Sequence, residues 1–399
     1  MRTPPGVSAA DFDKALKQFG DAVGSQWVFT SDDAVNTYKD AYSPFRGEAD
    51  ERVASAAVAP ETVEQVQKIV RTANQYSIPL YTISTGRNLA YGGSAPVYSG
   101  SVVLDLKRMN RILDLNEEQA YALVEPGVSY FDLYRRIRDR KMKLWIDCPD
   151  PGWGSVIGNA LDHGAGRTPL PYRDHFGAHC GMEVVLGTGD IVRTGMGALP
   201  ESKQWQHFQY GAGPSSDGLF AQSNLGVVTK MGFWLLPEPE ATMTGQISVP
   251  KHDDIVPLVR ILGKLHFQGV INCVFSLPSP VFAGPLDAEK SALLDKPGGG
   301  SAAEWDRYAA SKNRPFWTSE LRFYGPLKVI QAQWEHVKEQ LAAIDGVKFT
   351  DGTTLRFPLT DDEVSRLNDP TAIGVPSLNV FSTLQGTSGH LDASPMLPY

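Results

Sequence analysis

The feature that most constrains the fold is a glycine-bearing loop that directly follows a helix and a short strand. The loop begins Ser84-Thr85-Gly86-Arg87-Asn88 and runs on through Tyr91 and Gly92. Before it, apolar residues at helical spacing predict a helix that ends at Pro79: Val63, Val66, Ile69, Val70 and Ala73. Leu80–Ile83 then reads as a strand. A loop of small residues after a strand can aim several backbone N–H groups at one pyrophosphate, and a tight surface turn is the alternative.

Two further segments carry the same kind of residue. In the stretch from Asp147 to Gly164, small residues suit close packing of the backbone against a flat, extended cofactor: Gly154, Ser155, Gly158 and Gly164. The segment 223–230 is a small-residue turn that enters an apolar strand. Together the three segments favour a cofactor with a phosphate group over three unrelated surface turns.

Around these loops, short strands alternate with helices. Strands are expected at 101–106, 112–115 and 121–124, and a helix is expected over 131–137. Gly187-Thr188-Gly189-Asp190 between two apolar runs predicts a hairpin. The pattern indicates an α+β fold, and no G-x-G-x-x-G sequence follows a strand, so a Rossmann domain is disfavoured.

Prolines alternate with glutamates at 237–240, and this change of composition predicts a first domain over 1–240 and a second over 241–399. In the second domain we expect strands at 245–249, 270–275, 320–324 and 347–350, with helices at 254–265 and 328–344. Two successive β-α-β units predict a smaller α+β domain with an antiparallel sheet of ferredoxin-like type.

Charge and cysteine content exclude several classes of protein. The net charge of −8 over 399 residues argues against a nucleic-acid surface, which needs clustered Lys and Arg. No segment has the apolar length of a membrane span or a signal peptide. Three scattered cysteines do not make a disulfide framework or a zinc site. We therefore expect a soluble, cytoplasmic protein with no metal, and the sequence leaves open whether it forms a homo-oligomer.

The three segments, with Val124-Glu125-Pro126-Gly127-Val128 and 193–200, resemble the flavoprotein family of vanillyl-alcohol oxidase and p-cresol methylhydroxylase, in particular its 4-alkylphenol-oxidising branch. The resemblance is continuous from about residue 6 to 239 and returns near 374–378. It implies a p-cresol methylhydroxylase-type FAD-binding domain of two small α+β subdomains, followed by a substrate (cap) domain. The implied FAD-binding residues are Ser84, Thr85, Gly86, Arg87, Asn88, Tyr91, Gly92, Pro126, Gly127, Pro149, Asp150, Gly154, Ser155, Gly158, Asn159, Asp162, Gly164, Gly226, Val227, Val228 and His390.

The resemblance also implies catalytic roles. Asp150 matches a carboxylate beside the flavin, which can stabilise positive character or deprotonate a water. Tyr91 matches a tyrosine that binds the substrate phenolate. His390 matches the position where oxidases of this branch attach FAD covalently, and an exposed histidine in a glycine-rich turn is the alternative. The hydroxylases use a tyrosine slightly earlier, where this chain has Leu384, so a tyrosyl tether is disfavoured.

The sequence departs from the family at two places. Arg167 stands where a tyrosine is usual, and an arginine can hold a phenolate or a carboxylate by charge-assisted hydrogen bonds. Family members continue well past Ser394-Pro395, whereas this sequence stops at Tyr399. We therefore expect either a shortened chain or a substrate pocket that is built differently.

These features predict an FAD-dependent oxidoreductase that oxidises a para-substituted phenol through a quinone methide. Asp150, Tyr91 and Arg167 would be its catalytic residues, and dioxygen or an electron-accepting protein its oxidant. Three alternatives remain at this stage. The chain can be a dehydrogenase of a 2-hydroxy acid or another alcohol, a flavin-binding subunit without turnover, or an α+β protein that binds no flavin.

Overall fold

The computed structural model describes residues 3–40, 43, 45–88, 93–168, 171–172, 174–199, 201–282 and 286–379. Mixed sheets and helices confirm the α+β class. The chain forms two compact units. The first comprises Met1–Gly166, Tyr172–Pro237 and the segment from Asp369 on; the second comprises a short segment that begins at Arg167 and Glu238–Asn368.

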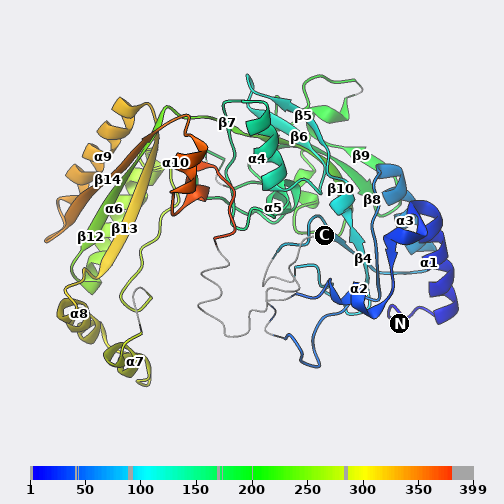
Figure 1. Ribbon diagram of the computed structural model, residues 1–399, viewed down its shortest axis with the longest axis horizontal. Helices are drawn as coiled ribbons and strands as arrows, with labels where there is room; N and C mark the ends of the chain where they lie inside the picture. The colour runs from blue at the N-terminus through cyan, green and yellow to red at the C-terminus, as the bar shows by residue number, and fades with distance from the viewer. Residues whose placement is uncertain are drawn as a thin grey trace. The chain divides into compact units, whose positions relative to one another are not determined.

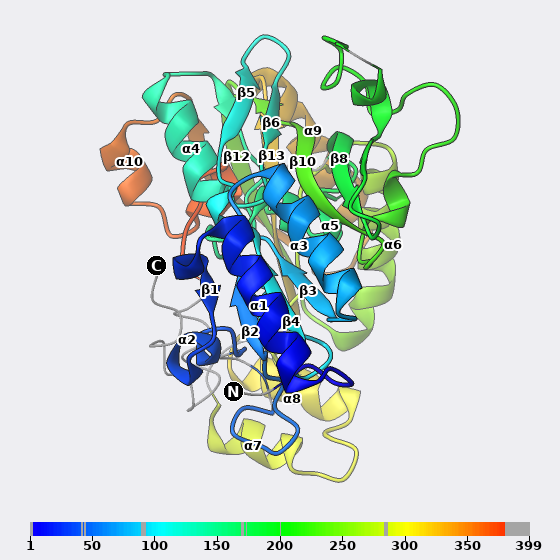
Figure 2. The same ribbon diagram turned by 90° about the vertical axis from the view of Figure 1, so that its right-hand side faces the viewer.

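The first unit contains a four-stranded sheet in the order β1-β2-β4-β3. Its strands are β1 Val28–Phe29, β2 Ala56–Val58, β3 Leu80–Ile83 and β4 Val102–Asp105. β2 and β3 run parallel to β4, and helices α1 (Ala9–Val23) and α3 (Val63–Gln75) lie side by side against them (Figures 1 and 2). The helical spacing that predicted α3 is confirmed, because its apolar stripe is the buried face.

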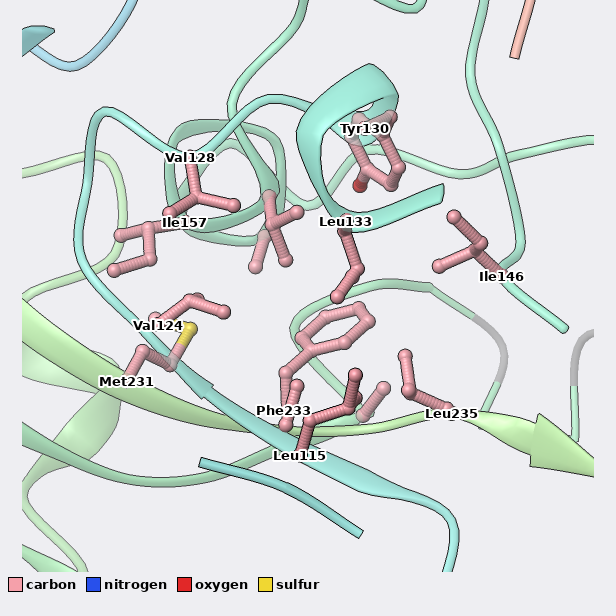
Figure 3. Packing of buried hydrophobic residues seen from close by; sticks show 14 of the residues in the cluster. Leu115, Val124, Val128, Tyr130, Leu133, Ile146, Ile157, Met231, Phe233 and Leu235 are labelled. Atoms are coloured by element: carbon pink, nitrogen blue, oxygen red, sulfur yellow. The ribbon is translucent and has the colours of Figure 1, made fainter. Parts of the chain in front are cut away.

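A five-stranded antiparallel sheet in the order β5-β6-β10-β8-β9 completes the first unit. Its strands are β5 Ile112–Asn116, β6 Tyr121–Val124, β8 His179–Leu186, β9 Ile191–Arg193 and β10 Gly226–Trp234. The predicted hairpin is confirmed as β8–β9. Leu133 of helix α4 (Tyr130–Asp139) points toward Phe233 of β10, and both side chains are buried in the core (Figure 3). The other α-helices and strands of this unit are α2 Asp32–Asn36, β7 Leu144–Trp145, α5 Val156–Leu161 and β11 Leu236–Pro237.

An ion cluster around one buried carboxylate joins β8, β9 and β10. The Glu183 side chain is 1% exposed and lies 2.9 Å from Lys230 Nζ and 2.7 Å from an Arg193 guanidinium nitrogen. Burial alone would raise the pKa of this carboxyl, but the hydrogen bonds from Lys230 and Arg193 outweigh burial and lower the pKa. The register between β8 and β10 shifts between Val228 and Lys230. The ion cluster lies at this irregularity and links the two strands there through their side chains.

The second unit contains a three-stranded antiparallel sheet in the order β13-β12-β14. The strands are β12 Ala241–Val249, β13 Trp317–Gly325 and β14 Lys348–Arg356, and helices α6 (Ile255–Phe267) and α9 (Leu327–Leu341) lie beside the sheet (Figure 1). Trp334 of α9 lies on Gly245, where a Cβ would come within 2.6 Å of its ring. The remaining helices are α7 Ala288–Leu294, α8 Ala302–Ser311 and α10 Asp361–Ser365.

The strand expected at 270–275 was a wrong prediction, because these residues form no strand. Cys273 Sγ, instead of a backbone oxygen, accepts a hydrogen bond from the Arg322 N–H of β13 at 3.3 Å. The segment then runs into Pro278 and Pro280, which cannot donate to a sheet ladder. In the described residues, the ferredoxin-like arrangement therefore lacks its second strand.

Candidate functional site

Helix α5 organises the site, although it is only six residues long. Ser155 caps it: Ser155 Oγ accepts a hydrogen bond from Gly158 N at 3.0 Å and donates one to the Pro126 carbonyl at 2.6 Å. The same turn is held from the other side, because a Cβ on Gly127 would lie 2.4 Å from the Lys107 carbonyl oxygen. The Pro126-Gly127 turn is thus fixed against the start of α5.

The first glycine-bearing loop packs against the same helix. A Cβ on Gly158 would lie 2.3 Å from Ser84 Oγ, so only glycine permits this approach without a shift. Asn88 Nδ2 donates to Asp162 Oδ2 at 3.1 Å, just beyond the end of α5. Lost hydration around the carboxyl raises the pKa of Asp162. The first two predicted segments therefore lie side by side.

The loop is also folded tightly on itself. Thr85 is buried, and Gly86 has a φ of +67°, which favours glycine. Ser94 Oγ donates to the Gly86 carbonyl at 3.1 Å and occupies the space where a Cβ would point. The Arg87 guanidinium lies over the Trp153 ring, 5.3 Å from its centroid.

Gln222, the residue just before the third segment, contacts α5. Its backbone N–H donates to the Leu161 carbonyl at 3.0 Å. Gly226 packs against Val184, where a Cβ would come within 2.5 Å. The Val227 and Val228 side chains belong to two separate buried clusters, so these residues can face a cofactor only through their backbone.

Asp150 lies on a half-buried turn that is held by a distant part of the chain. Ser377 Oγ donates to Asp150 Oδ2 at 3.1 Å, and the Gly152 N–H donates to the Ser377 carbonyl at 2.8 Å. A Cβ on Gly152 would lie 2.6 Å from Pro376. The segment 374–377, where the family resemblance returns, thus comes back to the predicted catalytic carboxylate, with Pro149 half-buried beside it.

A buried histidine lies next to this turn, and the sequence alone did not indicate it. His175 is 2% exposed and contacts Asp147 and Asn159. Asn159 is itself wrapped by the backbone at Gly164, whose N–H donates to the Asn159 carbonyl at 2.9 Å. The histidine lies 28 residues from Asp147 and 16 residues from Asn159 in the sequence, so no local spacing links it to these partners.

The other predicted residues differ in where the structure places them. Arg167 is exposed in the second unit, and its backbone carbonyl accepts a hydrogen bond from Tyr324 Oη at 3.3 Å. Tyr91, Gly92, Leu384 and His390 lie outside the described residues. The space beside Gly154 is open, because an added Cβ would meet no atom closer than 3.5 Å.

The described residues contain neither a metal-binding cluster nor a membrane-spanning helix. No cluster of three or more His, Cys, Asp or Glu side chains there is arranged to hold a metal ion. No helix among those residues combines the length and apolar character that a bilayer span needs.

Comparison with known proteins gives the context of this geometry. Residues 54–195 match the family model of a FAD binding domain. The chain is 37% identical over 338 residues to the 4-cresol dehydrogenase [hydroxylating] flavoprotein subunit of Pseudomonas putida, covering 84% of this chain and 64% of that protein. The chain therefore spans less than two thirds of the length of that relative.

Two solved structures share the fold over nearly the whole chain. p-Cresol methylhydroxylase with substrate bound superposes with a TM-score of 0.81 at 33% identity, covering 95% of this chain and 72% of that one. The 4-ethylphenol oxidase of Gulosibacter chungangensis, in complex with isoeugenol, has a TM-score of 0.82 at 36% identity, covering 96% and 73%. The first two predicted segments and Gln222, just before the third, lie together at helix α5. The chain thus belongs to the vanillyl-alcohol oxidase and p-cresol methylhydroxylase flavoprotein family and carries its FAD-binding domain.

Proposed function

We propose that this protein is an FAD-dependent oxidoreductase acting on a para-substituted phenol, of the 4-alkylphenol or 4-hydroxybenzyl alcohol type. The observation that carries the proposal is the tethered Asp150, held by Ser377 next to the helix on which the FAD-binding segments converge. Support comes from two structural relatives above 30% identity whose names specify 4-alkylphenols.

Bound FAD would supply a two-electron acceptor for the hydride on the benzylic carbon of the substrate. The phenol proton is released as the hydride leaves, which gives a quinone methide. Asp150 then accepts one proton from a water molecule while the hydroxide adds to the benzylic carbon, and the ring returns to a phenolate. The half-burial of Asp150 limits the water around it, which favours a defined position for the attacking molecule.

Arg167 and Tyr91 are the residues we expect to bind the phenolate. An arginine offers several N–H donors in a fixed plane, which suits an anionic oxygen. The same side chain would also suit a carboxylate, so oxidation of a 2-hydroxy acid is the competing outcome of a substrate test.

His390 is the proposed tether to FAD. His390 would hold FAD through a bond from its imidazole to the 8-methyl group of the flavin, with one methyl C–H bond lost as a proton and the two electrons passed to the final oxidant, and such a bond raises the oxidising power of the flavin. The final oxidant is dioxygen or an electron-accepting protein; the Pseudomonas putida relative is by its name one subunit of a larger dehydrogenase.

Anaerobic mixing of the yellow protein with 4-ethylphenol tests the proposal directly. We expect the flavin absorbance to bleach and 1-(4-hydroxyphenyl)ethanol to form, whereas ethylbenzene, the matched compound without the hydroxyl, leaves the spectrum unchanged. Bleaching by lactate or glycolate but not by the phenol would favour the hydroxy-acid dehydrogenase. A flavin that dithionite reduces but no donor does would indicate a binding subunit without turnover.

A further inference from the structure

One buried imidazole connects three segments of the first unit around the Asp150 turn. His175 Nε2 lies 2.9 Å from Asp147 Oδ2, on the stretch that leads into Asp150. His175 Nδ1 contacts Asn159 Oδ1, on α5, and lies 3.0 Å from Tyr130 Oη, on α4. Burial raises the pKa of the Tyr130 hydroxyl well above its ordinary value, so Tyr130 remains a neutral hydrogen-bonding group.

The Asp147 side of this network controls how the chain enters the Asp150 turn. Asp147 Oδ2 also accepts the Gly166 N–H at 2.9 Å, and a Cβ on Gly166 would lie 2.2 Å from Asp147 Oδ1. Cys148, the next residue, is fully buried. Only Pro149 then separates this fixed stretch from Asp150, so a displacement of Asp147 would be passed directly to the carboxylate.

Asp150 is therefore restrained from both sides along the chain. On the far side, Ser377 binds its carboxylate and the Gly152 N–H. On the near side, the restraint includes a hydrogen bond between two buried side chains, His175 and Asp147, whose exposed fractions are 2% and 9%. Breaking this pair is costly, because His175 Nε2 and the Asp147 carboxylate would each lose one hydrogen bond in a dry environment.

We propose that His175 is a positioning residue for Asp150, acting through its Nε2 bond to Asp147. The inference rests on the proposed function, in which Asp150 deprotonates the attacking water. It assigns separate roles to the two ring nitrogens: the Nε2 bond fixes the carboxylate, whereas the Nδ1 contacts hold α5 and α4.

Two variants of nearly equal size separate the nitrogens. In His175→Gln, the amide reaches the place of Nε2 and keeps a donor for Asp147. In His175→Asn, the shorter amide reaches only the place of Nδ1 and loses that bond. Both variants exchange a ring for an amide in the same buried site, so each serves as the matched control for the other.

The readout is the product ratio from 4-propylphenol. Its quinone methide either takes up water, giving the benzylic alcohol, or loses a proton, giving the alkene. A misplaced Asp150 disfavours only the first route, so the ratio of alcohol to alkene reports its position whatever the FAD content of the sample. We expect His175→Asn to lower this ratio about fivefold or more, whereas His175→Gln stays within about twofold of wild type.

Amide hydrogen exchange gives a second readout that does not depend on turnover. On the same purified proteins, the peptide that contains Gly152 should exchange faster in His175→Asn than in His175→Gln, because the turn loses its near-side restraint. If His175→Asn does not fold, Asp147→Ala removes the same bond from the other partner and has to lower the ratio in the same way.

The outcomes separate the two proposals. Equal ratios in the two histidine variants, or a lower ratio in His175→Gln, would refute the positioning role. Loss of folding in all three variants would make His175 a purely structural residue and would also refute it. A wild-type protein that forms neither alcohol nor alkene would instead refute the proposed function.

Discussion

Replacing Gly127 by alanine tests whether the Pro126-Gly127 turn is held by a backbone contact. The added Cβ would lie 2.4 Å from the Lys107 carbonyl oxygen and 2.8 Å from that of Met109. Gly127 does not have a positive φ, so these contacts are the reason for glycine at this position. Because both neighbours are backbone atoms, no side-chain rotation can relieve the overlap.

The magnitude follows from the shift that is needed. An ordinary contact would require the turn to retreat by about 1 Å, which is typical of overpacked cores. The retreat would also stretch the 2.7 Å hydrogen bond from Gly127 N to the Met109 carbonyl. Together the two effects should cost about 2–4 kcal/mol of unfolding free energy.

Urea unfolding of the FAD-free protein is the suitable assay, since bound FAD would stabilise the native state by mass action. Gly154→Ala is the matched control: its nearest neighbour would be the Pro151 carbonyl oxygen at 3.5 Å, an ordinary contact. We expect the control to change stability by less than about 1 kcal/mol. If Gly127→Ala unfolds at the wild-type midpoint, or if the control loses as much stability, the backbone contact does not hold the turn.

Three further predictions follow from described contacts and from the proposed tether. Glu183→Gln should destabilise the protein by about 1–3 kcal/mol at neutral pH. The pKa of Glu183 is lowered in the folded protein. The difference in unfolding free energy between wild type and Glu183→Gln should therefore shrink as the pH falls through that folded pKa, and urea unfolding at several pH values measures it. Ser377→Ala should reduce the alcohol-to-alkene ratio about tenfold with little change in melting temperature, because it removes a hydrogen bond to the Asp150 carboxylate. Acid precipitation of wild type should give a yellow pellet and that of His390→Ala a white one; a white wild-type pellet would rule out the tether.

Much of the fold was predictable from local sequence. The apolar stripe of α3 and the Gly-Thr-Gly-Asp hairpin gave the right elements, because helical spacing and turn residues act over a few positions. The strand expected at 270–275 failed for a tertiary reason. The apolar residues of this segment suit a strand. The Arg322 N–H of β13, however, donates its hydrogen bond to the Cys273 sulfur, and two prolines follow in the sequence.

The site was predictable in its parts but not in its arrangement. Small residues pointed to the three segments, and in the structure Gly158 and Gly226 allow these segments to pack closely on neighbouring protein atoms. Their convergence on α5 depends on single contacts such as Ser84 with Gly158 and Gln222 with Leu161, which no periodicity encodes. His175 was missed for the same reason, since its partners Asp147 and Asn159 are distant in sequence.

The length of α5 has a consequence for engineering. Each end of this six-residue helix is bonded to a different loop, at Ser155 and at Asp162. One inserted residue would rotate everything beyond it by about 100° and would misalign the second bond while the first stayed in place. Tags, linkers or loop grafts therefore belong elsewhere, for example around Gly213, where an added Cβ would meet nothing within 4 Å.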